Sequence, residues 1–107
     1  MPETLMQAQM YTPEALKHEA LTRNCHRMVN YGLAVPELLD RYAIRAAELA
    51  PGMNPSQFSV ILNAFARSAH RHDEMLRTFT RRMPPKLQHF SPMDICQTCN
   101  AYAKFRE

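Results

Sequence analysis

Two stretches of the chain carry the same pattern: NPSQFSVILNAFAR (residues 54–67) aligns without gaps on SPMDICQTCNAYAK (residues 91–104). Pro55 and Pro92 set the offset between them at 37 residues. The same offset relates three further identical pairs, Asn63/Asn100, Ala64/Ala101 and Ala66/Ala103. When the same offset is applied toward the N-terminus, apolar residues of the earlier part of the chain align with apolar residues of the later part, although few residues are identical. A fixed period of about 20 to 50 residues is typical of stacked helical repeats, so the chain is predicted to be a short α-solenoid.

Each unit is predicted to be a pair of helices. Asn54 and Ser91 are suitable N-cap residues, because their side chains can accept hydrogen bonds from the exposed N–H groups of a first helical turn. Each precedes a proline, which tolerates the first helical position. After Asn54, apolar residues recur three and four positions apart, as in an amphipathic helix: Phe58, Ile61, Leu62, Phe65 and Ala69. The second helix of this unit ends at Pro84-Pro85, and its apolar side consists of Met75, Leu76, Phe79 and Met83.

The first unit follows the same plan with a weaker pattern. Thr12-Pro13-Glu14 is expected to start a long helix that runs to about Tyr31 and breaks near Gly32. Its partner is expected to run from Pro36 to about Leu49, with an inward side formed by Leu38, Leu39, Tyr42, Ala46 and Leu49. The chain is thus predicted to be one all-α domain, residues 1–107, of about two and a half helix-turn-helix units at approximately 13–53, 54–90 and 91–107.

The third unit is truncated after its first helix. That helix has no partner, so part of its apolar stripe is expected to be incompletely covered, and the candidate partner-binding residues are Ile95, Cys99 and Tyr102. In the alignment Cys99 falls on the core position of Leu62, where a free cysteine behaves as a small hydrophobe. Two and a half units lie near the minimum for stability, so the protein is expected to work in company.

Composition and motifs argue against several classes of function. Apolar residues make up 46% of the chain, yet no apolar stretch approaches the ~20 residues that span a bilayer. There is no Gly-rich phosphate loop, nucleophile elbow or His-Glu-x-x-His motif, so neither an enzyme nor a small-molecule substrate is predicted. Cys96-x-x-Cys99 with His89 lacks a fourth ligand for structural zinc, so we expect no metal and no cofactor. The first 20 residues hold three Glu and no Arg, unlike a secretory signal or a transit peptide.

Positive charge is concentrated in one part of the chain. The formal net charge is +3. Residues 67–86 contain two acidic residues, Asp73 and Glu74, and six basic ones: Arg67, Arg71, Arg77, Arg81, Arg82 and Lys86. This stretch is either a solvated basic helix face or a surface that faces a polyanion. Arg81, Arg82 and Lys86 surround the expected end of a helix, where cations also interact favourably with the helix dipole, so they can be explained without any ligand.

The strings NPSQFSVILNAFAR and FSPMDICQTCNAYAKF resemble the heptatricopeptide and octotricopeptide repeat families, whose repeats of about 37 or 38 residues often open with a Ser-Pro-x-Asp/Glu cap. The resemblance covers residues 54–107 well and residues 17–53 weakly. The first unit has Lys17-His18 in place of the cap and proline, and His26-Arg27 in place of Asn-Ala. The resemblance implies an α-solenoid with RNA on its inner face and a role in organellar, chiefly mitochondrial, RNA metabolism or ribosomes.

The candidate RNA-binding residues are Asn63, Arg67, Arg71, Arg81, Arg82, Lys86, Asn100 and Lys104. Asn63 and Asn100 flank the core stripe, where an amide either bonds a base edge or phosphate, or ties neighbouring helices together. Arg67 and Lys104 lie one turn later and either hold phosphates or form a solvated helix end. We therefore predict a small non-catalytic subunit of a mitochondrial ribosome that binds rRNA beside neighbouring proteins. The alternative is a protein–protein adaptor or accessory subunit of a mitochondrial respiratory or ATP-synthase complex.

Overall fold

The computed structural model describes residues 9–106, and this part of the chain is helical without any strand. Five α-helices lie wholly within these residues: α2 (His18–Asn30), α3 (Pro36–Leu49), α4 (Pro55–Arg67), α5 (Asp73–Arg82) and α6 (Pro92–Phe105). Of three short 3₁₀ helices, η1 (Pro13–Ala15) precedes α2, η2 (Ala50–Gly52) lies between α3 and α4, and η3 (Pro84–His89) lies between α5 and α6. The expected all-helical class is confirmed, and the predicted bounds of α3 agree with the structure.

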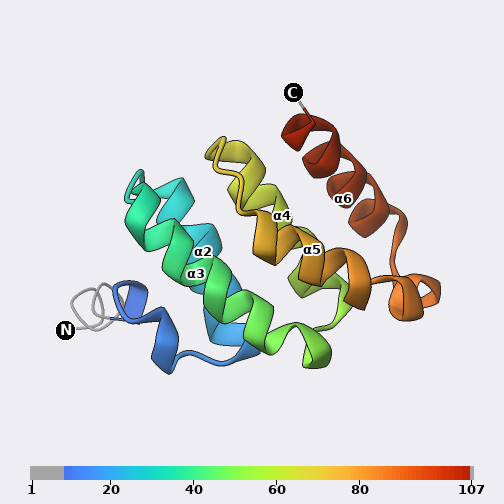
Figure 1. Ribbon diagram of the computed structural model, residues 1–107, viewed down its shortest axis with the longest axis horizontal. Coiled ribbons are helices and arrows are strands. Elements are labelled where there is room, and N and C mark those ends of the chain that lie inside the picture. The colour runs from blue at the N-terminus through green and yellow to red at the C-terminus, as the bar shows by residue number, and fades with distance from the viewer. Residues whose placement is uncertain (1–8, 107) are drawn as a thin grey trace.

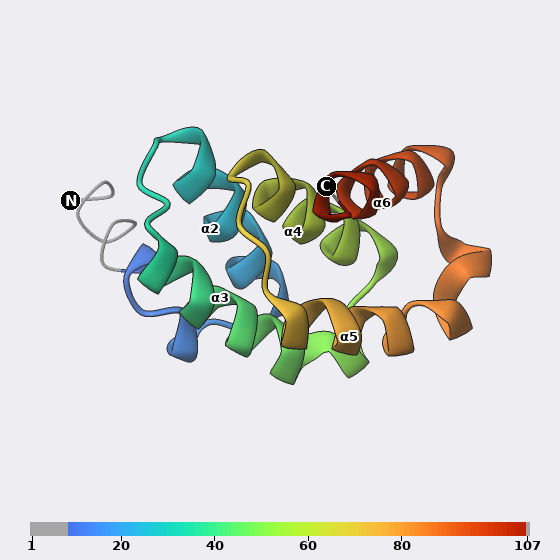
Figure 2. The ribbon, with the colours of Figure 1, turned by 45° about the horizontal axis from the view of Figure 1, so that its top comes forward.

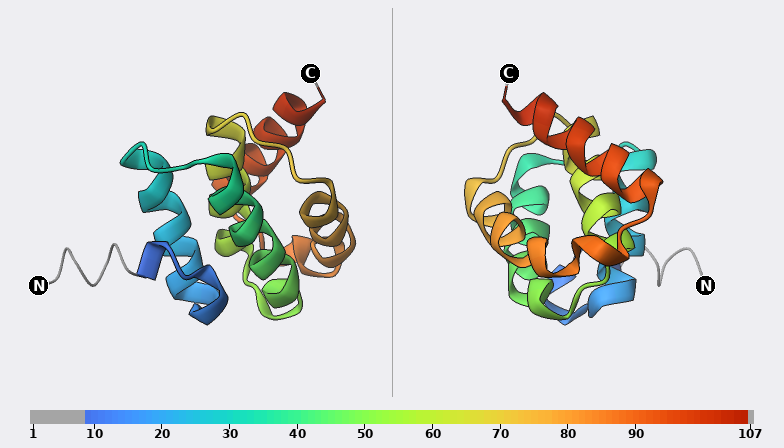
Figure 3. Two further views of the ribbon diagram at one scale, coloured as in Figure 1. Left: turned by 60° about the vertical axis from the view of Figure 1, so that its left-hand side comes forward. Right: turned by 90° about the vertical axis from the view of Figure 1, so that its right-hand side faces the viewer.

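The helices form two layers (Figures 1 and 2). Helices α2, α4 and α6 lie side by side in one layer, with α4 packed between the other two. Helices α3 and α5 pack against each other in the second layer. At the C-terminal end of the molecule, η3 connects α5 in one layer to α6 in the other (Figure 3). The core therefore lies between the layers.

Capping starts α4 and α6 in the same way. The Asn54 side chain accepts from the Gln57 N–H at 2.9 Å, and the Gln57 side chain accepts from the Asn54 N–H at 3.1 Å. Ser91 and Asp94 form the equivalent reciprocal pair at 3.1 Å in both directions. Each pair satisfies two N–H groups that the first turn leaves without an intrahelical partner. The predicted N-caps are confirmed.

The core is built around the aromatic residues of α4. Phe58 and Phe65 are fully buried, and the Phe58 ring meets Phe79 of α5 edge-on at a centroid distance of 4.9 Å. Tyr42 of α3 is also buried, and its hydroxyl donates to the Met10 carbonyl at 2.8 Å. Burial of each such ring stabilises the fold by about 1.5–3 kcal/mol relative to an exposed ring. The contact between Phe58 and Phe79 joins the two layers.

The prediction of one continuous helix from Thr12 to about Tyr31 is wrong. The chain forms η1, passes through Leu16 and Lys17 in extended conformation, and begins α2 only at His18. Leu16 is buried, and its carbonyl accepts from the Arg45 guanidinium at 2.9 Å. Packing of Leu16 and the bond from α3 thus take the place of another helical turn.

The assignment of Ala69 to the apolar stripe of α4 is also wrong. Helix α4 ends at Arg67, and Ala69 is exposed with a left-handed φ of 53°. The His70 N–H returns to the Phe65 carbonyl at 3.1 Å, which satisfies one of the last acceptors of the helix. Ala69 therefore forms the turn that ends α4 and contributes nothing to the core.

Cys99 differs from the core residue on which it aligns. Leu62 of α4 is fully buried, whereas Cys99 of α6 is exposed. Ile95 is exposed as well, and Tyr102 is half-buried, so the expected incomplete cover of the α6 stripe is confirmed. Helix α6 packs on α4 along one side only, because no further helix of residues 9–106 lies beyond it.

Candidate nucleic-acid interface

A surface hollow of ≈ 390 Å³ separates α4 from α6, and we call it the α4–α6 hollow. Its lining residues are Asn63, Ala66, Arg67, Asn100, Ala101 and Lys104. Four of the eight predicted RNA-binding residues meet here, two from each helix. Arg67 lies on the side of α4 opposite Phe58 and Phe65, because a helix turns about 100° per residue. The hollow is thus on the face of its layer that points away from the core.

The repeated sequence explains why these side chains meet. Asn63 and Asn100 lie at equivalent positions of two neighbouring helices, and so do Arg67 and Lys104. Within each helix the amide and the cation are four residues apart, so both lie on one face. The equivalent residues Ala66 and Ala103 and the lining residue Ala101 are small, which leaves room for a concave surface.

The amides of the α4–α6 hollow are free to bind a ligand. Neither the Asn63 nor the Asn100 side chain forms a hydrogen bond within residues 9–106, and the Lys104 ammonium has no ion-pair partner in that range. The bond between the helices is made elsewhere, by the Ser59 hydroxyl donating to Asp94 at 3.0 Å. The interpretation that the two amides tie neighbouring helices together therefore has no bond to support it. Arg67 donates to the Asn30 side chain of α2.

A second hollow, of ≈ 550 Å³, adjoins the first. It shares Ala66, Arg67 and Lys104 with the α4–α6 hollow and adds Arg71. No acidic residue lines either hollow. Some of the hydrogen-bond donors of the Arg71 guanidinium are already used, because it donates to Asp73 at 2.6 Å and to the Phe105 carbonyl at 2.7 Å. The two hollows together form a basic surface with three exposed cations, Arg67, Arg71 and Lys104.

Lys86 is not part of this surface. Its ammonium donates to the carbonyls of Pro51 and Met53 at 2.9 and 2.5 Å, and it stands 5.4 Å from the centre of the Phe58 ring. These contacts hold the connection after α3 against α4. Lys86 therefore has a structural position that its sequence neighbourhood of arginines did not indicate.

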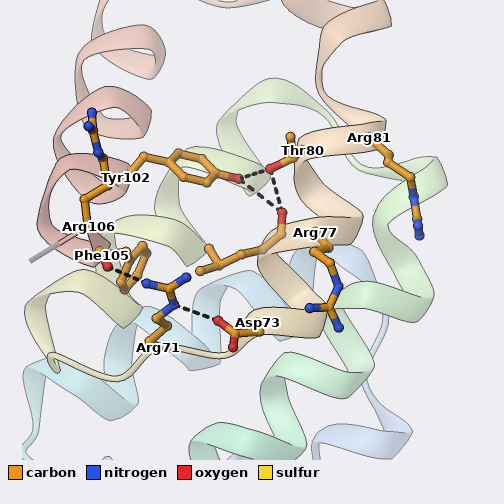
Figure 4. A pocket seen from close by; sticks show the side chains of 9 residues that line it. Arg71, Asp73, Arg77, Thr80, Arg81, Tyr102, Phe105 and Arg106 are labelled. Atoms are coloured by element: carbon orange, nitrogen blue, oxygen red, sulfur yellow. Dashed lines mark hydrogen bonds and ion pairs between the residues drawn. The ribbon is translucent and has the colours of Figure 1, made fainter.

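The remaining predicted cations lie on α5. Arg81 lines a cleft between α5 and α6 together with Arg71, Arg77 and Arg106, whereas Arg82 is exposed outside it. Figure 4 shows that these arginines do not converge: Arg71 turns to Asp73, while Arg81 and Arg106 extend in different directions. The Arg71 guanidinium beside Asp73 lowers the pKa of that carboxyl. The basic stretch 67–86 is thus divided between two faces.

Arg77 and Arg106 are charged residues of the cleft that the candidate RNA-binding residues did not include. The spacing of Arg77 and Arg81, four residues apart on one helix face, was available in the sequence as a signal. Arg106 directly follows the last residue of α6, so its approach to α5 depends on tertiary packing.

The cysteines and histidines form no metal site in residues 9–106, where no group of three or more potential ligands lies together. Cys96, Cys99 and His89 are all exposed. Burial raises the pKa of the Cys25 thiol to about 12, so this residue is a neutral core side chain at physiological pH. In the same range no helix is both long and apolar enough to cross a bilayer, as the sequence indicated.

Comparisons with protein-family models, curated proteins and solved structures find no significant match to this chain. Membership of a tricopeptide-type repeat family therefore stays a prediction from the two aligned strings.

Proposed function

We propose that the chain is a short α-solenoid that binds single-stranded RNA through the α4–α6 hollow and has no catalytic role. The solenoid assignment is supported by the first residues of α2, α4 and α6, which are His18, Pro55 and Pro92 and follow each other at 37-residue intervals. Left-handed turns at Gly32 and Ala69 repeat at the same interval. The two-layer arrangement also agrees with a stack of helix pairs.

The observation that carries the proposal is the α4–α6 hollow itself. It presents an amide and a cation from each of two neighbouring helices, at equivalent positions and without an acidic neighbour. Amides offer both a donor and an acceptor to a base edge, while Arg and Lys neutralise backbone phosphates. Because single-stranded RNA exposes its base edges and phosphates together, it is the polyanion that suits this combination.

The proposed biological setting is a mitochondrial ribosome, where the protein would bind rRNA beside other proteins. This part rests on the resemblance of residues 54–67 and 91–104 to organellar RNA-binding repeats. A surface formed by two helices contacts only a few nucleotides, which favours a place inside a larger particle over independent sequence-specific binding.

The test is the salt dependence of RNA binding. We expect the chain to bind a fluorescently labelled single-stranded RNA of about 12 nucleotides, with log Kobs falling linearly as log salt rises. Removal of two phosphate contacts by Arg67→Gln with Lys104→Gln should lower the magnitude of the slope by about 1.4, since each contact on a single strand contributes about 0.7. Asn63→Ala with Asn100→Ala should leave the slope intact and weaken the preference among bases.

A matched control removes equal charge elsewhere. Lys17→Gln with Arg82→Gln changes two exposed cations outside the α4–α6 hollow and should leave the slope nearly unchanged. Circular dichroism of all variants establishes that helicity is retained. If the control pair reduces the slope as much as the hollow pair, binding is diffuse and the proposed interface is wrong.

A further inference from the structure

The stripe of α6 that faces the second layer is only partly covered, because Tyr102 reaches Thr80 of α5 while Ile95 stays exposed. On α4 the corresponding residues Phe58, Ile61 and Phe65 are buried, and Phe79 of α5 is in edge-on contact with Phe58. Their equivalents on α6, at the 37-residue offset, are Ile95, Thr98 and Tyr102. Ile95 is 46% exposed. Helix α6 therefore exposes part of the face that is buried on α4.

Beside this stripe two adjoining hollows lie between η3, α5 and α6, and we call them together the α5–α6 trough. Its first part is a hollow of ≈ 320 Å³ near η3, lined by Thr80, Met83, Pro84, Leu87, Thr98 and Tyr102. The second part is the ≈ 570 Å³ cleft of Figure 4, and Thr80 and Tyr102 line both parts. Leu87 is 52% exposed at the η3 end. The trough thus runs along α5 and α6 with an apolar end.

The other end of the trough is basic. Arg77, Arg81 and Arg106 line it against a single acid, Asp73, which Arg71 already neutralises. The side chains of Arg81 and Arg106 extend outward from opposite walls in Figure 4, so they lie along a rim and do not enclose one point. A single small anion would meet few of them together. An elongated acidic partner would meet them in succession.

We propose that the α5–α6 trough binds an acidic amphipathic helix of a partner protein, placed on α6 as α5 is placed on α4. The apolar face of the partner covers Ile95, Leu87 and the Tyr102 ring, and its carboxylates pair with the rim arginines. Met83, Pro84 and Leu87 offer no polar side-chain group to a phosphate, which favours a protein helix over RNA at this end. This site lies on a different surface from the α4–α6 hollow and does not depend on RNA binding.

A designed peptide provides the probe. It copies residues 72–83, keeps the apolar Met75, Leu76, Phe79 and Met83, and carries Arg77→Glu, Arg81→Glu and Arg82→Glu; a lactam bridge on the exposed side keeps it helical. We expect saturable binding of this acidic peptide to the full chain by fluorescence anisotropy. The parent peptide with its arginines should bind at least about tenfold more weakly, because like charges then meet at the rim.

Variants of the full chain locate the binding. Ile95→Asp and Leu87→Asp should each weaken acidic-peptide binding by about tenfold or more. Ile44→Asp is the matched control, since Ile44 is 48% exposed on α3, away from the trough, and should leave the affinity unchanged. Arg77→Glu with Arg81→Glu should reverse the preference toward the basic peptide. Thermal melting of each variant shows that the fold is retained.

Three outcomes would overturn the proposal. The first is no saturable binding of the acidic peptide up to about 1 mM, a concentration that detects even weak association. The second is an equal loss of affinity in the Ile44→Asp control and the Ile95→Asp variant. The third is loss of RNA binding, with no effect on the peptide, in the trough variants; this would assign the trough to nucleic acid.

Discussion

Helices α4 and α6 begin alike and end in different surroundings. Both open with a reciprocal capping pair and a proline, and their sequences align without gaps. Yet α4 buries seven of its residues, whereas α6 buries only Ala101 and Phe105. The difference comes from their neighbours, because α4 has a helix on each side within its layer, while α6 has only α4 there and reaches α5 through Tyr102 near its C-terminal end. Local sequence thus determines where these helices start, and the layers determine what each of them buries.

The same contrast separates two kinds of surface. The outer faces of α4 and α6 together form the basic α4–α6 hollow, because both helices contribute equivalent polar residues there. On the inner side the equivalence breaks down: α4 is a core element, and α6 borders the open α5–α6 trough. The two aligned sequences therefore form a common outer face, whereas the inner face is buried on α4 and partly exposed on α6.

The largest expected effect tests the core role of α4. Phe65→Ala should destabilise the fold by about 3–5 kcal/mol, because it removes a fully buried ring and leaves a cavity. The equivalent change on α6, Tyr102→Ala, should cost only about 1–2 kcal/mol, since that ring is half-buried and its hydroxyl contacts only the Thr80 hydroxyl and, at 3.4 Å, the Leu76 carbonyl. Urea denaturation of both variants measures the difference. Equal costs would show that α6 is as much a core helix as α4.

The second prediction concerns Lys86, whose ammonium faces the Phe58 ring of α4. Lys86→Ala should destabilise the fold by about 1–3 kcal/mol, because it removes two charged hydrogen bonds and a cation that faces Phe58. Arg82→Ala, an exposed cation nearby in the sequence, should change stability by no more than about 0.5 kcal/mol. The same denaturation experiment compares the two. A negligible effect of Lys86→Ala would return this residue to the set of possible phosphate contacts.

Much of the fold follows from local sequence, and the exceptions have distant causes. The caps at Asn54 and Ser91 were predictable because they depend on residues three positions apart. The break before α2 was not, since the Leu16 carbonyl is held by Arg45, 29 residues away. The role of Lys86 also depends on carbonyls 33 and 35 residues away, in the turn after α3. Interactions of this separation leave no local pattern.

The residues of the candidate surfaces also differ in how far the sequence could predict them. Asn63, Asn100, Arg67 and Lys104 were predictable as a group, because repeat equivalence alone brings them onto adjacent helices. The trough residues were only partly predictable. Exposure of the α6 stripe followed from the missing partner helix, but the contribution of Arg106 follows from how α6 packs beside α5.

A third prediction separates local from global stability. Ser91→Ala should cost about 1 kcal/mol at the start of α6, because the Asp94 N–H loses its acceptor. Hydrogen exchange of α6 amides should accelerate about fivefold while α4 core amides keep their protection, since an edge helix can fray without unfolding the core. Asn54→Ala, the equivalent change on α4, should accelerate exchange in both helices. If Ser91→Ala also affects the α4 amides, α6 belongs to the same cooperative unit.

The smallest expected effect concerns the turn that ends α4. Ala69 adopts a left-handed φ of 53°, which crowds its Cβ against the backbone, whereas Gly32 reaches a φ of 71° at the equivalent turn without a Cβ. Ala69→Gly should therefore stabilise the fold by about 0.5–1 kcal/mol, after the greater entropy of glycine in the unfolded chain offsets part of the relieved strain. Gly32→Ala should have the opposite sign and similar size, because no atom outside Gly32 and its two chain neighbours lies within 4 Å of an added Cβ, so only the backbone conformation resists it. Thermal denaturation of the two single variants measures both signs. If both changes destabilise, the turn after α4 is held by side-chain contacts of Ala69, and the local backbone rule that relates these two turns does not apply.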